Sequence, residues 1–181
     1  MLDNLRADTR RLREFKTKSF PWYVLESLFF ENGYQAILLY RIASAFKRWG
    51  VPILGPLFAR LSLFLTGVDI APGARIGPGL LVAHGTGLVI GDRVVIGRDA
   101  ILLHQVTIGA SGRDTRDAMP VIGDRVFVGA GARLIGGIRV GDDVFVGTNA
   151  VVTRDLPDGA KLILKQQFRE PRSPSSRSNR R

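Results

Sequence analysis

Aliphatic residues return at every sixth position through the centre of the chain. Thirteen of them keep this register, with interruptions after the third and the seventh: Ile70, Ile76, Val82, Ile90, Ile96, Leu102, Ile108, Ile122, Val128, Leu134, Val140, Val146 and Val152. Ordinary strands and helices show periods of 2 and 3.6 instead. Six residues can form one short strand and one corner, and three such units make a coil whose aliphatic side chains stack into a continuous core. The pattern therefore predicts a parallel β-helix of slightly more than four coils.

Glycine follows the aliphatic residue in eight of these units: Gly77, Gly91, Gly97, Gly109, Gly123, Gly129, Gly141 and Gly147. We expect these glycines to relieve the backbone at the turns, because a positive φ costs glycine little. The two interruptions predict loops that project at corners of the coil. The first contains residues 84–87, and the second, polar and glycine-containing, spans residues 110–120.

Residues 1–66 contain no six-residue units. Apolar residues at helical spacing predict a helix from Tyr23 to Trp49, ended by Gly50 and Pro52, and a second short helix from Leu54 to Phe64. We expect this segment to cover the open first coil. The predicted organisation is a helical segment over 1–66, a β-helix over 67–160 and a basic tail over 161–181.

Charge and composition narrow the functional classes. The formal net charge is +10, and residues 165–181 hold six basic residues against one acid, Glu170. Such a Pro/Ser/Arg segment cannot form a core, so we expect a disordered, solvated tail and no nucleic-acid partner. The absence of cysteine excludes disulfides and thiolate metal sites. The most apolar stretch, residues 51–68, is broken by prolines and an arginine, so we expect a cytoplasmic protein and leave contact with a membrane surface open.

The chain has two histidines, and both stand two residues after the start of a unit. Those starts are three units apart, which predicts that His84 and His104 occupy one column of adjacent coils, about 4.8 Å apart. A histidine is the natural general base near neutral pH, and it needs a partner that orients its ring. Asp69 is a candidate for that partner, and a turn cap is the alternative role for it. A carbonic-anhydrase type of metal site needs three histidines, so none is expected.

Two stretches of the sequence resemble the catalytic domain of serine acetyltransferases. They are VDIAPGARIGPGLLVAHGTGLVIGDRVVIG and, after the second loop, PVIGDRVFVGAGARLIGGIRVGDDVFVGTNAVVTRDLP, and the resemblance extends over roughly residues 38–157. It implies a left-handed β-helix that forms a homotrimer or a dimer of trimers, with acetyl-CoA as co-substrate in a groove between subunits, and a role in cysteine biosynthesis. Asp69 and His84 match the spacing and flanking residues of the family's catalytic pair. The resemblance thus implies that His84 deprotonates an acceptor hydroxyl, which attacks the thioester.

The same resemblance implies two further sets of site residues. His104 and Met119 would meet the acceptor. The donor would lie against a larger set: Gly109, Ala110, Arg113, Gly129, Ala130 and Gly147. Arg116, in the same loop as Arg113, could also meet the phosphates of CoA.

Three departures from the family pattern bear on specificity. Ala118 and Met119 stand where relatives carry Arg-His before the proline, and Ala83 replaces an acid beside the catalytic histidine. The usual C-terminal Gly-Val-Pro-Ala element, which lies against CoA in relatives, is missing after Ala160. Three functions follow as alternatives: O-acetyl transfer to serine or a related small acceptor, O-acetyl transfer to a sugar hydroxyl of a surface polysaccharide, and a non-catalytic scaffold.

Overall fold

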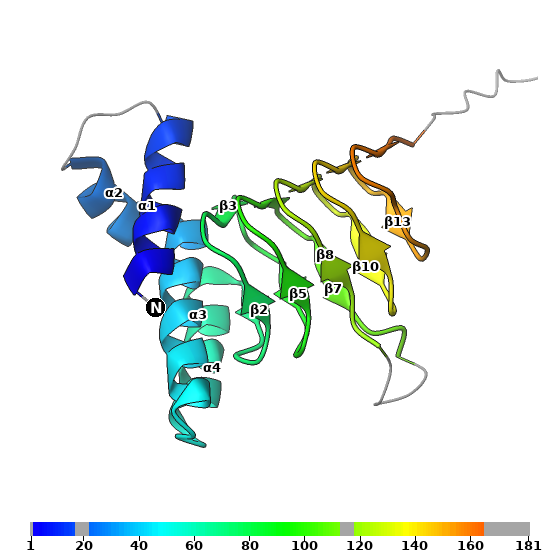
Figure 1. Cartoon of the computed structure of the whole chain (residues 1–181). Coiled ribbons are helices and arrows are strands. Elements are labelled where there is room, and N and C mark those ends of the chain that lie inside the picture. Colours follow the sequence, from blue (N-terminus) through cyan, green and yellow to red (C-terminus); the bar gives the residue numbers. More distant parts are fainter. Residues whose placement is uncertain (1, 17–21, 113–117, 165–181) are drawn as a thin grey trace, which may run out of the picture.

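The computed structural model describes residues 2–16, 22–112 and 118–164, and in it helices precede a solenoid of short strands (Figure 1). The helices are α1 (Leu2–Lys16), α2 (Trp22–Phe30), α3 (Asn32–Arg48) and α4 (Leu54–Thr66). The strands of the first two coils are β1 (Asp69–Ile70), β2 (Arg75–Ile76), β3 (Leu81–Ala83), β4 (Val89–Ile90), β5 (Val95–Ile96) and β6 (Ile101–Leu103). Those that follow are β7 (Thr107–Gly109), β8 (Val121–Ile122), β9 (Phe127–Val128), β10 (Arg133–Ile135), β11 (Arg139–Val140), β12 (Phe145–Val146), β13 (Val151–Val152) and β14 (Lys161–Leu162).

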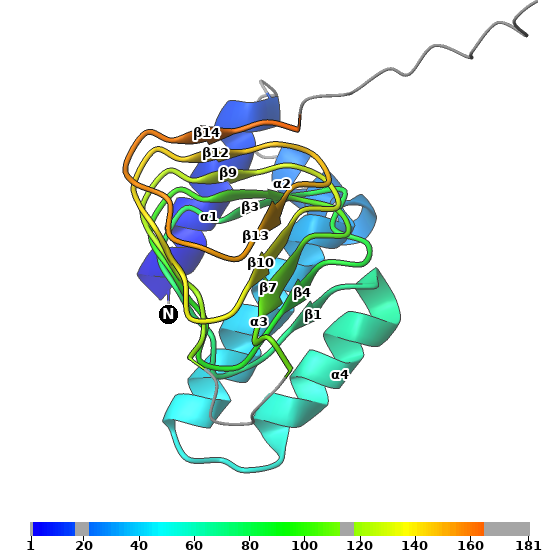
Figure 2. The same ribbon diagram turned by 90° about the vertical axis from the view of Figure 1, so that its right-hand side faces the viewer.

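The strands form three parallel sheets, one on each side of a triangular coil. Sheet A has the order β1-β4-β7-β10-β13, sheet B the order β11-β8-β5-β2, and sheet C the order β14-β12-β9-β6-β3. Figure 2 looks along the stack, so the coils superpose and the strands of sheets A and C line two of the sides. The fold is the parallel β-helix that the six-residue period predicted, with the left-handed course that the family resemblance implied.

The core lies inside this prism. All thirteen aliphatic residues that define the sequence register are buried, none with more than 5% of its surface exposed. Strand pairing places them in columns, such as Ile70 beside Ile90 and Val82 beside Leu102. Stacking therefore builds a core that no single coil could bury, and this prediction is confirmed.

The expected reason for the eight glycines is wrong. None of the eight has a positive φ. The residues with a positive φ at the regular corners are mostly not glycine, and Arg93, Gln105 and Asn149 are examples. Instead, a side chain would collide with the next coil at most of these positions. At Gly77 an added Cβ would lie 2.6 Å from the carbonyl oxygen of Gly97, and at Gly129 it would lie 2.7 Å from the Thr148 nitrogen. Glycine is needed there because the coils approach closely.

The helical segment packs on the first coil, as expected, with α3 against β3 and α4 against β1 (Figure 1). It differs from the prediction in two ways. The single helix predicted from Tyr23 to Trp49 is interrupted at Glu31, which has extended backbone angles (φ −107°, ψ 95°). In addition, α1 was not predicted, and it is held by a buried ion pair between Asp8 and Arg41 of α3.

The solenoid ends later than the expected boundary at residue 160. Strand β14 pairs with β12, with Lys161 beside Phe145 and Leu162 beside Val146. The remainder of the predicted tail, residues 165–181, lies outside the described residues. Within the described part of the chain, no helix is both long enough and apolar enough to cross a bilayer.

Candidate active site

The corner between β3 and β4 carries the first insertion in the repeat, residues 84–87. His84 follows the last residue of β3, is exposed, and has a left-handed backbone with φ 55°. Gly85 behind it is buried, and an added Cβ there would lie 2.7 Å from Val82 Cγ1 and 2.9 Å from Val68 Cγ2. Only glycine fits this inward position, so the chain can turn toward the core at Gly85. His84 is left at the outer surface of the corner.

The second histidine lies at the corresponding corner of the next coil. Ala83 pairs with Leu103, so His84 and His104 each follow a paired residue at the edge between sheets C and A. The inserted residues then change the stacking, because Gln105 N–H donates to the carbonyl of Thr86 at 3.0 Å. Thr86, and not His84, is therefore the residue of this corner that stacks on the next coil just before its turn. The predicted column of adjacent coils holds for Ala83 and Leu103, which precede the histidines, and it ends at the corner.

Asp69 begins β1, on the coil before the histidine corner. It is half-buried and pairs with Val89, the first residue after that corner. Ile70 points into the core, so the side chain of Asp69 points to the outer face of sheet A. In the part of the chain that the structure describes, the Asp69 carboxylate and the His84 ring form no hydrogen bond with each other. Catalytic hydrogen bonds are often long in ligand-free structures and shorten when the substrate binds.

The start of α3 holds this corner in place, which the sequence analysis did not predict. The Asn32 side-chain amide donates to Thr86 Oγ1 at 3.0 Å and to the Thr66 carbonyl at 3.3 Å. At Gly33 a side chain would run into the carbonyl of Val82. The sequence feature that could have revealed this helix start is the Asn32-Gly33 pair within an apolar helical pattern, because Asn-Gly marks turns and helix boundaries.

The residues expected to meet the donor lie at two edges of sheet A. Gly129, Ala130 and Gly147 lie at the edge between sheets C and A, where Gly131 N–H donates to the His104 carbonyl at 3.0 Å. Gly109 and Ala110 lie at the opposite edge, at the end of β7. Arg113 and Arg116 fall outside the described residues. The structure thus brings three of the six donor residues to the histidine edge.

Two further residues, Met119 and Arg133, bear on the description of the site. Met119 is half-buried and packs against the hydrophobic core, and its expected contact with the acceptor stays a prediction. Arg133, on the outer face of sheet A, donates to the carbonyls of Gln105 and Gly131 and so joins two coils beside His104. No sequence pattern marks Arg133, because its partners are backbone atoms of the adjacent corners.

Comparisons with known proteins agree on one family. Residues 119–154 match the model of the bacterial transferase hexapeptide family (six repeats). The chain is 41% identical over 163 residues to a serine acetyltransferase of Helicobacter pylori, which covers 90% of this chain and 94% of that protein. It is 39% identical over 163 residues to the Mycobacterium tuberculosis serine acetyltransferase, covering 90% of this chain and 70% of that protein.

Solved structures give the same result. Neisseria gonorrhoeae serine acetyltransferase in complex with serine superposes with a TM-score of 0.79 at 32% identity, covering 89% of this chain and 65% of that one. Brucella abortus serine acetyltransferase in complex with coenzyme A superposes with a TM-score of 0.80 at 29% identity, covering 87% and 62%. The chain therefore spans nearly all of the Helicobacter protein and a little under two thirds of these crystallised chains.

Proposed function

The chain belongs to the serine acetyltransferase family, and from this we propose that it transfers the acetyl group of acetyl-CoA to the hydroxyl of L-serine. The observation that carries the proposal is the 41% identity over nearly the whole of the Helicobacter enzyme. The described site agrees with it, because an exposed histidine stands at a solenoid corner and the half-buried Asp69 pairs with the first residue after that corner. The relatives named above are serine acetyltransferases, which favours serine over a sugar hydroxyl and an enzyme over a scaffold.

The residues at the corner suit a direct transfer. His84, as general base, takes the proton of the serine hydroxyl while the hydroxyl oxygen attacks the thioester carbonyl. The tetrahedral intermediate collapses, the carbon–sulfur bond breaks, and the CoA sulfur leaves with the proton that His84 received. Asp69, which lies on the outer face of sheet A, has the role in this mechanism of orienting the histidine ring and stabilising its positive charge once serine closes the site.

The active unit in this proposal is a homotrimer with the donor between subunits. The exposed valines on the outer face of sheet A support it, since Val89 is 40% and Val151 61% exposed beside the histidine edge. A neighbouring subunit on this face would cover them and would supply a second wall to the groove. The expected cytoplasmic location and the role in cysteine biosynthesis stay predictions.

An acceptor assay tests the proposed function. CoA release is followed with a thiol reagent while L-serine, or a nucleotide sugar in a parallel series, is varied at saturating acetyl-CoA. We expect saturable release with L-serine at concentrations up to about 1 mM, the usual range for KM. Saturable release with the nucleotide sugar alone would instead assign the enzyme to sugar acetylation.

A further inference from the structure

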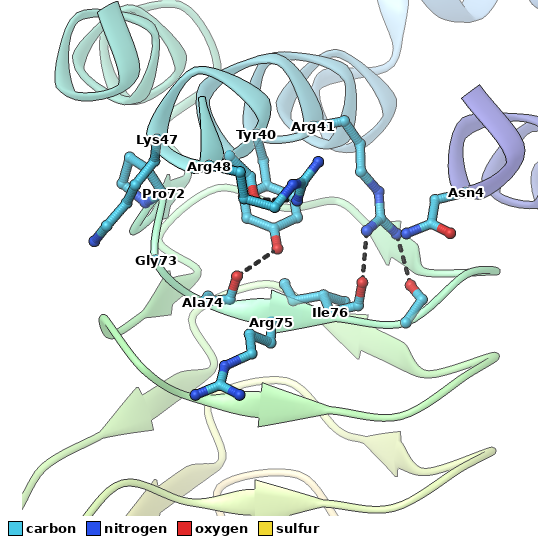
Figure 3. A pocket seen from close by; sticks show the side chains of 12 residues that line it. Asn4, Tyr40, Arg41, Lys47, Arg48, Pro72, Gly73, Ala74, Arg75 and Ile76 are labelled. Atoms are coloured by element: carbon cyan, nitrogen blue, oxygen red, sulfur yellow. Dashed lines mark hydrogen bonds between the residues drawn. The ribbon is translucent and has the colours of Figure 1, made fainter. Parts of the chain in front are cut away.

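A cavity of about 530 Å³ lies between α3 and the first coil (Figure 3). One wall comes from the second half of α3 and another from β2 with the turn before it, while α1 contributes Asn4. The residues that line it are Asn4, Tyr40, Arg41, Ser44, Lys47, Arg48, Pro72, Gly73, Ala74, Arg75, Ile76 and Gly77. A volume of this size is typical of sites for small organic ligands.

This cavity is separate from the histidine corner. The first residue of α3, Asn32, contacts that corner, whereas Lys47 lies fifteen residues further along the same helix. At about 1.5 Å per residue, these two points are about 22 Å apart. None of the residues that line the cavity belongs to the site described above.

The floor of the cavity is fixed by hydrogen bonds to the backbone of the first coil. Figure 3 shows Tyr40 and Arg41 reaching from α3 to this coil, where Tyr40 donates to the Ala74 carbonyl at 2.8 Å. Arg41 donates to the carbonyls of Ile76 and Gly77, both at 2.6 Å. Because these side chains are buried and fully engaged, the floor exists before any ligand arrives.

The cavity has an excess of positive charge. Four cations line it, and two of them are neutralised, Arg41 by Asp8 and Lys47 by Asp92 at 2.7 Å. Arg48 donates to the Ser44 hydroxyl at 3.0 Å, and among the described residues it has no acidic partner. Arg75 is exposed on β2 and has no partner among the described residues. Two guanidinium groups without an acidic partner thus belong to the lining of one cavity, Arg48 on α3 and Arg75 on β2, and Figure 3 shows the Arg75 side chain pointing away from α3.

We propose that this cavity binds a small phosphorylated metabolite at a second site, with Arg48 and Arg75 on the phosphate. Guanidinium groups match phosphate oxygens with paired hydrogen bonds, and both side chains are exposed and long enough to turn toward an anion between them. Ser44 and Asn4 add neutral hydrogen-bonding groups, while Pro72 offers apolar surface to the organic part. The ligand is a dianion, because two positive charges are left without a partner.

Calorimetric titration of the full-length protein with inorganic pyrophosphate, at constant ionic strength, tests the proposal. We expect saturable binding that weakens at least tenfold in the double variant Arg48→Gln/Arg75→Gln. The matched control is Arg60→Gln/Arg139→Gln. It removes the same charge from an exposed helix position and from an exposed strand position of sheet B, the sheet that contains Arg75. The control should bind within twofold of wild type.

Three results would overturn the proposal. Equal weakening in both double variants would mean that only the overall charge attracts the anion, and no saturable binding would mean that the cavity is not an anion site. Displacement of pyrophosphate by saturating CoA would mean that the cavity is part of the donor site. Since the arginines lie away from the histidine corner, the KM for acetyl-CoA should stay within twofold in Arg48→Gln/Arg75→Gln, whether or not serine is the acceptor.

Discussion

Ala83 ends β3, is half-buried, and directly precedes His84. The resemblance to serine acetyltransferases implies an acid at this place, which this chain lacks. A carboxylate at this place could pair with the amino group of serine. Its absence leaves the acceptor's positive charge without a partner from this position.

We therefore expect Ala83→Asp to lower the KM for L-serine by about tenfold, the effect of about 1.4 kcal/mol of added binding. A hydrogen bond to a charged group commonly contributes that much. Steady-state kinetics at saturating acetyl-CoA measure the change, with Ala83→Asn as the uncharged control of similar size. An equal KM in the two variants would show that the acceptor's amino group lies elsewhere.

Single residues account for both the success and the failure of the sequence analysis. The aliphatic positions could be predicted because each faces the same core at a fixed spacing, and all thirteen are buried. The glycines were recognised and given the wrong cause, since the approach of the next coil is a property of the stack. Arg133 was missed because its partners are carbonyl groups, which carry no residue identity.

At the scale of elements, α3 joins the helical segment to the histidine corner. Asn32 makes two hydrogen bonds there, one to the Thr86 side chain and one to the Thr66 backbone. His84 has a left-handed backbone at this corner, a conformation that non-glycine residues adopt only when their surroundings impose it. The hydrogen bonds of Asn32 are part of those surroundings.

Replacing Asn32 with alanine should lower kcat about fivefold and leave the KM for acetyl-CoA unchanged. The reason is the loss of about 1 kcal/mol of hydrogen bonding that positions the corner. The control is Gln35→Ala, which removes an amide of the same helix that bonds to the Leu28 carbonyl at 2.9 Å, away from the corner. If both variants lose the same activity, Asn32 acts only through the stability of the helices.

The buried pair between Asp8 and Arg41 ties α1 to α3 and to the first coil. Arg41 contacts both carboxylate oxygens, at 2.9 and 3.1 Å, and the Leu80 N–H donates to Asp8 at 2.9 Å. Burial raises the pKa of Asp8, while Arg41 and the Leu80 N–H oppose that shift. Loss of the carboxylate would leave a buried guanidinium without its counterion.

Asp8→Ala should therefore reduce the free energy of unfolding by about 3 kcal/mol, as breaking one side of a buried ion pair does. Urea denaturation followed by circular dichroism measures this. Asp3→Ala on the same helix is the control, because the Asp3 side chain is 93% exposed and its pair with Arg6 contributes little. Equal midpoints for the two variants would mean that the pair does not stabilise the fold.

The helices explain why part of the fold could not be predicted. Helix α1 is polar over most of its length, and it is held by a few contacts with distant residues: the Asp8–Arg41 ion pair across 33 positions, the hydrogen bond between Thr9 and Tyr34, and the packing of Leu12 against Leu81. A contact of that kind leaves no periodic trace in the sequence. The interruption at Glu31 was hidden for a related reason, because α2 and α3 both carry apolar residues at helical spacing.

At the scale of the whole molecule, the proposed site lies along one edge of the prism, and in the proposed trimer a second subunit completes it. The histidine edge carries Gly129, Ala130 and Gly147, and the neighbouring face of sheet A exposes valines. A second subunit placed on this face would close the groove. The edge of the fold followed from the repeat, whereas the donor residues were implied only by the family resemblance, and the proposed closing subunit lies beyond any one chain.

Light scattering after size-exclusion chromatography checks the assembly. One chain is 19.8 kDa, so a trimer has a mass of about 59 kDa, and a dimer of trimers has twice that. We expect one of these two masses at micromolar protein. A monomer that turns over at the full rate would contradict a donor groove between subunits.

The most direct test of the whole account is the rate of serine-dependent CoA release by His84→Ala. A general base contributes between about a hundredfold and ten thousandfold, so we predict that kcat falls by about three orders of magnitude while circular dichroism and the oligomer are unchanged. His104→Ala, altered on the next coil of the same edge, should retain kcat within tenfold. If His84→Ala keeps the wild-type rate, His84 is not the base and the proposed mechanism is wrong.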